Sequence, residues 1–184
     1  MEWHDMKKSL LLLGIIFSSA STVSAAETSL VRQVCGNTSS IPYNECVVAL
    51  NGDFRTKKIR GIRALTFLSL DLAMANSSEA AGFVGGMAVK APAGLKRVLK
   101  FCYDSLYSSN RNFHSAVGDL MVDPMVANYD VLIAMDGVRN CRYQMETANV
   151  SIPAVNQRCN NVELFVRICY TTTNLAKKFS GKAI

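Results

Sequence analysis

Six cysteines are the side chains of this 184-residue sequence that are best suited to covalent chemistry. No two of them are spaced as Cys-x-x-Cys, and after residue 25 the chain has one histidine, His114, so a zinc site would lack ligands. An even number of cysteines in an exported chain is typical of disulfide bonds rather than of metal ligands. We therefore expect these residues to cross-link the fold: Cys35, Cys46, Cys102, Cys141, Cys159 and Cys169.

Other side chains that could support catalysis are isolated. A hydrolase would need a nucleophile with its base, or a carboxylate pair in a cleft, and the sequence has no nucleophile elbow and no metal motif. His114 follows Phe113 in a helical stretch and is expected at the surface or at the edge of the core. Asp119 and Asp123 flank a helix end and are expected to be solvated. We therefore predict that the chain is not an enzyme and binds no cofactor.

Aromatic side chains that could stack on a sugar are the basis of a second reading, a carbohydrate-binding protein. Tyr103 and Tyr107 are four residues apart and could share a helix face. The only tryptophan, Trp3, lies in the segment that we expect to be removed. We favour the interpretation that the two tyrosines lie at the edge of a helical bundle.

The N-terminus is typical of a secretory signal. Lysines precede an apolar run over residues 10–17, and residues 23–25 fit the small-residue pattern before a cleavage site. The run is shorter than the roughly 20 residues that span a membrane. We therefore predict a signal peptide over residues 1–25 and one secreted domain over residues 26–184.

Charge and sequons agree with export. The net charge of +6 is scattered without a basic block, which excludes nucleic acid as a partner. Asn-x-Ser sequons begin at Asn37, Asn76 and Asn149, and we expect at least one of them to be glycosylated.

The elements that must position these residues are helices separated by prolines. Proline fits the first turn of a helix but not its interior, and Pro42, Pro92, Pro124 and Pro153 divide the chain into segments without strand-like alternation. The shorter segment 30–46 is expected to form one or two helices folded back as a hairpin.

Four longer helices follow in the prediction. The first runs over residues 56–89, capped by Asp53, and its late glycines weaken it so that it could break or bend near Gly85. The third runs over about 126–146, and the last begins near Asn161 after a polar loop.

The second long helix has the clearest pattern. Its apolar and small residues step by four and three, which is the packing stripe of a bundle helix. The stripe consists of Leu95, Leu99, Cys102, Leu106, Ser109, Phe113, Ala116 and Leu120. Short connections favour antiparallel neighbours, so we predict an all-α, disulfide-stapled, antiparallel up-down four-helix bundle with a short N-terminal helical hairpin.

The ordered cysteines resemble the frame of the plant invertase and pectin methylesterase inhibitor family. Cys35 and Cys46, with ten residues between them, match the pair in that family's helical hairpin. Cys102 and Cys141 match the pair that ties two bundle helices. The stretch from Arg60 to Asn76 resembles the family's first bundle helix, and the match covers nearly the whole exported chain.

The resemblance implies two disulfides, Cys35–Cys46 and Cys102–Cys141. Cys169 matches a fifth cysteine that is often unpaired in the family, and Cys159 is extra. If the last helix begins before Cys159, the two cysteines are ~15 Å apart along it and cannot bond. If Cys159 lies in a loop, a bridge between them is possible.

The resemblance also implies a function and a place, namely a secreted inhibitor in the cell wall or apoplast. In the family, inhibitors of pectin methylesterase lay bundle helices across the pectin-binding cleft in a one-to-one complex. By periodicity, the polar faces of the long helices would then carry these candidate target-binding residues: Arg63, Lys96, Lys100, Asp104 and Arg111.

Invertase is the alternative target. The family's invertase inhibitors insert a loop with a Pro-Lys-Phe motif, and Pro124, Met125 and Val126 occupy a similar position here. Methionine cannot replace the lysine's ion pair, so the sequence favours pectin methylesterase. For this segment, the alternative to a binding role is that Pro124 simply starts a helix. For the whole chain, the third interpretation is a diverged bundle protein without inhibitory activity.

Overall fold

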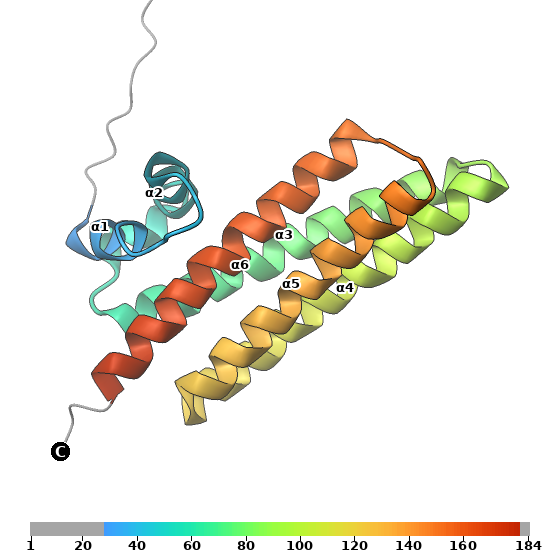
Figure 1. Ribbon diagram of the computed structural model, residues 1–184. Coiled ribbons are helices and arrows are strands. Elements are labelled where there is room, and N and C mark those ends of the chain that lie inside the picture. The colour runs from blue at the N-terminus through green and yellow to red at the C-terminus, as the bar shows by residue number, and fades with distance from the viewer. Residues whose placement is uncertain (1–27, 181–184) are drawn as a thin grey trace, which may run out of the picture.

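The computed structural model describes residues 28–180, and the predicted signal peptide over residues 1–25 lies outside these described residues (Figure 1). This part of the chain is helical and contains no strand. Its elements are α1 (Ser29–Cys35), α2 (Tyr43–Asn51), the 3-10 helix η2 (Phe54–Lys58), α3 (Ile62–Lys90), α4 (Ala93–Val122), α5 (Pro124–Thr147) and α6 (Pro153–Ser180).

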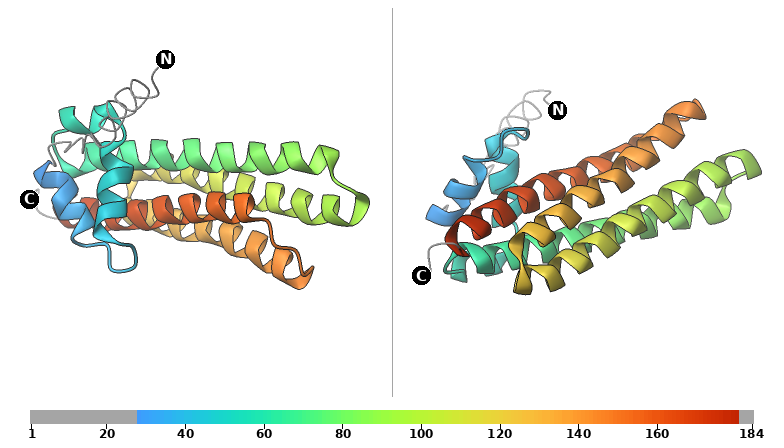
Figure 2. Two further views of the ribbon diagram at one scale, coloured as in Figure 1. Left: turned by 90° about the horizontal axis from the view of Figure 1, so that it is seen from above. Right: turned by 60° about the horizontal axis from the view of Figure 1, so that its bottom comes forward.

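The four long helices form an up-down bundle. Each packs against the next along the chain, and α6 closes the bundle by packing against α3. The short hairpin of α1 and α2 lies at the end of the bundle where α3 begins and α6 ends, and α1 contacts α6 there (Figure 2). The predicted all-α bundle with an N-terminal hairpin is confirmed.

The apolar stripe of α4 is the part of the core that the sequence predicted best. From Leu99 to Leu120 every member of the predicted stripe is buried, while Leu95 is half-buried. Asn110 is not a member of the predicted stripe, but it is buried, and its side chain donates to the Met74 carbonyl at 2.8 Å and to Ser77 Oγ at 3.2 Å. A polar residue is accepted in this core because α3 supplies both acceptors.

Helix α3 begins later than predicted and ends where it was predicted to end, within one residue. Asp53 does cap a helix, but it is η2, through the Arg55 amide at 2.8 Å, and α3 begins only at Ile62. Gly61 makes the turn between them with φ of 96°, a conformation that favours glycine. The prediction allowed a break or a bend near Gly85, and the helix has no break there: it is continuous to Lys90 and packs on α4 and α6.

Helix α6 begins eight residues earlier than predicted, at Pro153 rather than at Asn161. Pro153 starts the helix with a fixed φ and no need for an amide donor. Val155 and Cys159 are buried and extend the apolar face back from Val162 into the stretch that was predicted as a loop. Polar residues lie between these apolar residues, so the helical pattern could not be recognised in the sequence.

Candidate target-binding surfaces

The cysteine positions determine which surfaces are rigid. Disulfides join Cys35 to Cys46, between α1 and α2, and Cys102 to Cys141, between α4 and α5. These are the pairs that the resemblance implied. Cys159 and Cys169 are buried free thiols on α6, and since both lie in one helix, ten residues and about 15 Å apart, they cannot bond to each other.

Four of the predicted target-binding residues form one exposed line on α4. Lys96, Lys100, Asp104 and Arg111 are exposed and recur at multiples of about one helical turn, with Tyr107 between the last two. The line is about 22 Å long at 1.5 Å per residue. Lys100 Nζ lies 3.2 Å from Asp104 Oδ2 at the surface. We call these five residues the α4 stripe.

Aromatic rings lie along the same face. The Tyr103 and Tyr107 rings are stacked, with centroids 6.0 Å apart and planes within 10° of each other. The Arg111 guanidinium lies 5.9 Å from the Tyr107 centroid. A Cβ on Gly85 of α3 would lie 3.0 Å from the Tyr103 ring. Because glycine has no side chain, the ring can pack closely against α3 at this position. The face therefore combines cations with ordered aromatic surface, and two of its residue types, tyrosine and arginine, are enriched at protein interfaces.

Arg63 is exposed on α3, outside this surface, and its role as a contact residue remains a prediction. Its Nη2 donates to the carbonyls of Leu120 and Met121 at 3.0 and 3.1 Å. The last carbonyls of a helix have no partner within it, and a nearby cation satisfies them. Arg63 on α3 thus caps the C-terminus of α4.

The segment that resembles the invertase-binding loop is a helix junction. Only Asp123 separates α4 from α5, and its carboxylate accepts from the Met125 amide at 2.7 Å, so Pro124 is the first residue of α5. The tip is apolar, because Val122 is 88% and Met125 55% exposed, and Met121 and Val126 are also exposed. The tip carries no exposed lysine, and the nearby Arg63 is engaged in capping.

Close to this tip two carboxyl groups face each other across α4 and α5. Asp119 was expected to be solvated, but it is half-buried next to Asp130. Burial and the Asp119 carboxyl raise the pKa of Asp130, and Ser115 opposes the shift. No third His, Cys, Asp or Glu joins them, and the described residues contain no cluster of three that could hold a metal ion.

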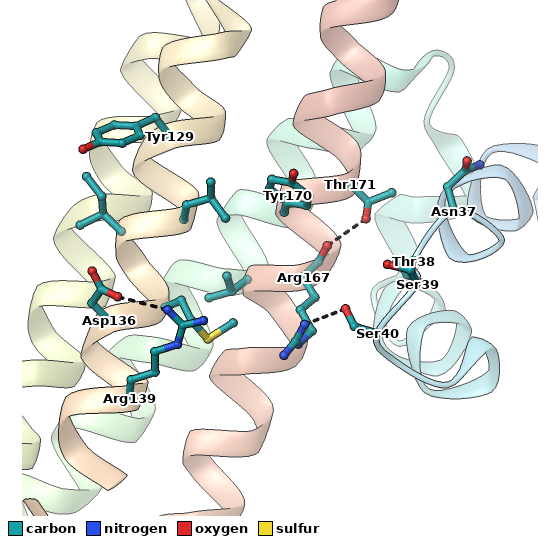
Figure 3. Close-up of a pocket in the computed structure, with 14 residues that line it drawn as sticks. Asn37, Thr38, Ser39, Ser40, Tyr129, Asp136, Arg139, Arg167, Tyr170 and Thr171 are labelled. Carbon is teal, nitrogen blue, oxygen red and sulfur yellow. Dashed lines mark hydrogen bonds and ion pairs between the residues drawn. The ribbon is translucent and has the colours of Figure 1, made fainter. Parts of the chain in front are cut away.

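A groove that the sequence did not indicate lies between the hairpin and the bundle (Figure 3). It has a volume of about 500 Å³. The turn after α1 forms one wall, and α5 and α6 form the other. Arg167 Nη1 donates to Ser40 Oγ at 2.6 Å and so ties α6 to the turn. Tyr129 and Leu132 on α5 are exposed. Met125, Tyr129 and Leu132 follow one another at steps of four and three residues, which was the signal available in the sequence.

The groove carries no unpaired guanidinium. Arg167 also donates to Glu163 on its own helix, and Glu163 receives a second hydrogen bond from Arg142 at 2.6 Å. Burial raises the pKa of Glu163, but the hydrogen bonds from Arg142 and Arg167 outweigh it, so the pKa lies below its usual value. Arg139 lies 3.6 Å from Asp136 at the surface.

The structure separates the three sequons by their surroundings. Asn37 and Asn149 are exposed in turns, and Asn149 has φ of 52°. Asn76 is half-buried in the middle of α3, where its side chain donates to the Leu72 carbonyl at 2.9 Å. Its neighbour Ser77 is buried. No helix among the described residues is long and apolar enough to cross a membrane.

Solved structures with this fold are known. The crystal structure of mutant form A of a pectin methylesterase inhibitor from Arabidopsis aligns with a TM-score of 0.69 and 20% identity, covering 80% of this chain and 97% of that chain. The crystal structure of a pectin methylesterase inhibitor from Arabidopsis thaliana aligns with a TM-score of 0.59 and 19% identity, covering 81% and 97%. No family model and no curated protein matches the sequence. The chain therefore has the helical-bundle fold of these inhibitor structures, as the cysteine frame implied.

Proposed function

We propose that the chain is a secreted inhibitor that binds a pectin methylesterase one-to-one and blocks its pectin-binding cleft, without catalytic activity of its own. The observation that carries the proposal is the α4 stripe, an exposed cationic and aromatic line on a bundle with the fold of two pectin methylesterase inhibitors. The surface is rigid, because a disulfide joins α4 to α5. A preordered surface loses little conformational entropy on binding.

Invertase is the second candidate target, and the exposed apolar tip around Met125 is the observation that favours it. The tip lacks the lysine that the family's invertase inhibitors present to the carboxylates of the sucrose site. A desolvated ion pair contributes strongly to such contacts, and methionine does not form one. Pectin methylesterase is therefore the favoured target.

Secretion and glycosylation complete the proposal. The expected signal peptide and the disulfides both fit an oxidising, extracellular compartment such as the plant cell wall. Asn37 and Asn149 are the proposed glycan sites, because each lies exposed in a turn. Asn76 is the unfavourable sequon, since it is half-buried within α3 and its neighbour Ser77 is buried. Peptide mapping of the exported protein after enzymatic deglycosylation distinguishes the three.

Enzyme titration tests the proposed function. The exported chain, produced in an oxidising host, is added in increasing amounts to a pectin methylesterase and to a cell-wall invertase at mildly acidic pH. Loss of esterase activity that saturates near one-to-one, with invertase unaffected, is the expected result. Inhibition of invertase alone would assign the contact to the apolar tip. A folded helical chain that inhibits neither enzyme would reject the inhibitor proposal.

A further inference from the structure

Three cysteines meet in the core where α4, α5 and α6 pack together. Cys102 on α4 and Cys141 on α5 form a disulfide, and Cys159 on α6 is a free thiol. The Sγ atoms of Cys159 and Cys141 are 3.9 Å apart, and all three side chains are fully buried. A free thiol in contact with a disulfide sulfur is the arrangement from which thiol–disulfide exchange starts.

We propose that this cluster is a thiol–disulfide exchange site, in which Cys159 attacks Cys141 Sγ and displaces Cys102. In this step Cys159 loses its proton to solvent base, a Cys141–Cys159 bond forms and the Cys102–Cys141 bond breaks. Cys102 leaves as a thiolate and takes up a proton. One disulfide replaces another, so the exchange needs no oxidant or reductant.

The structure supports both the attack by Cys159 on Cys141 and the departure of Cys102. The attacking and attacked sulfurs need to move together by only about 2 Å to reach bonding distance. Cys102 Sγ lies 3.3 Å from the Cys141 carbonyl oxygen, which can accept from the thiol that Cys102 becomes. The covalent link then joins α5 to α6 instead of α4, and α4 is held by packing alone. The exchange thus changes the helix that is covalently joined to α5 from α4 to α6.

The surroundings of Cys159 set the rate. Burial raises the pKa of its thiol to about 11, Arg142 on α5 lowers it and Glu163 on α6 raises it. Since the thiolate is the nucleophile, the native pairing persists at neutral pH, and the exchange accelerates about tenfold per pH unit below that pKa.

Peptide mapping tests the inference on the full exported chain, because trypsin places each of the three cysteines on its own peptide: residues 101–111, 140–142 and 159–167. The folded protein is held in mildly alkaline buffer, quenched with acid, alkylated and digested. We expect a peptide pair joining 140–142 to 159–167, with Cys102 alkylated, at a level at least about tenfold above that in a sample held at mildly acidic pH. Cys169→Ala is the matched control, and it should exchange like the unaltered chain because Cys169 lies about 15 Å away along α6.

Two results with the unaltered chain would overturn the inference. One is that the unaltered chain keeps only the 101–111 to 140–142 link while circular dichroism shows it folded. The other is that Cys169 joins the new pairs in similar amounts, which would mean exchange through unfolding. A second variant, Cys102→Ala, tests whether the sulfurs of Cys141 and Cys159 can come to bonding distance in the folded chain. After treatment with oxidised glutathione it should form the Cys141–Cys159 disulfide. A folded Cys102→Ala chain that retains both thiols would also contradict the proposal.

Discussion

Gly137 sets the distance between α4 and α5. A Cβ at this position would overlap Ser109 Oγ and the Ser105 carbonyl oxygen of α4. Glycine in a helix interior costs about 1 kcal/mol relative to alanine. In the structure that cost is offset by the close approach of the two helices. One turn further along, the Cα atoms of Cys102 and Cys141 are 4.3 Å apart.

The Gly137→Ala variant should therefore be destabilised despite the better helix propensity of alanine. Backbone atoms of α4 block the new methyl group, so the helices must separate. We expect a loss of about 2–4 kcal/mol in the free energy of unfolding. Chemical denaturation followed by circular dichroism measures it.

Gly82 on α3 provides the matched control for this substitution. Nothing lies within 4 Å of a Cβ at Gly82, so Gly82→Ala should stabilise the protein by up to about 1 kcal/mol. Equal stability of Gly137→Ala and the unaltered chain would show that α4 and α5 are not in this close contact.

Glu163 links stability to pH. Its pKa lies below the usual value, so its contribution to stability is present above the pKa of the unfolded chain and is lost as pH falls through the lower folded value. The Glu163→Gln variant should be less stable by about 1–2 kcal/mol at neutral pH, since Arg142 and Arg167 lose a charged acceptor. Denaturation across a pH series should show the difference shrinking in acid.

The exposed pair of Asp136 and Arg139 is the comparison for Glu163. Exposed ion pairs contribute little, so Asp136→Asn should change stability by less than about 0.5 kcal/mol at any pH. A pH-independent deficit for Glu163→Gln would mean that it acts through packing and not through charge.

At the scale of the helices, the sequence was informative where the apolar pattern was regular. Helix α4 was predicted together with its buried apolar face, because Leu99, Leu106 and Phe113 repeat every seven residues. The start of α6 was missed because Val155 and Cys159 are separated by polar residues, and a short polar segment after proline resembles a loop. Local pattern therefore located the helices, and packing partners determined their ends.

Contacts between distant segments could not be predicted from pattern. The capping role of Arg63 depends on α4 ending beside the start of α3, 57 residues away in the chain. The groove of Figure 3 depends on where the turn around Ser40 meets α6. Periodicity places a residue on a face, but it does not say which neighbour that face meets.

Arg63→Ala distinguishes the two roles considered for this residue. Loss of the two hydrogen bonds to the end of α4 should lower the free energy of unfolding by about 1 kcal/mol and leave inhibition unchanged. Arg97→Ala, at an exposed position of α4, should change stability by less than about 0.5 kcal/mol. A loss of inhibition by Arg63→Ala with unchanged stability would show that Arg63 contacts the target enzyme.

At the scale of the whole molecule, the bundle offers a partner three different surfaces. The α4 stripe is charged and aromatic, the tip around Met125 is apolar, and the groove beside the hairpin has its guanidinium groups paired internally. Among these three surfaces, only the stripe combines three exposed cations with stacked aromatic rings. This difference is the reason to assign target binding to α4.

Charge reversal on the stripe tests that assignment most directly. The double variant Lys100→Glu with Arg111→Glu is compared with a control of equal charge change, Lys57→Glu with Lys177→Glu, whose positions are exposed and outside α4. Affinity for pectin methylesterase is measured for both after circular dichroism shows that they are folded. The account predicts a loss of at least about tenfold, or about 1.4 kcal/mol, for the stripe variant and little change for the control. Equal affinities for the two variants would contradict it.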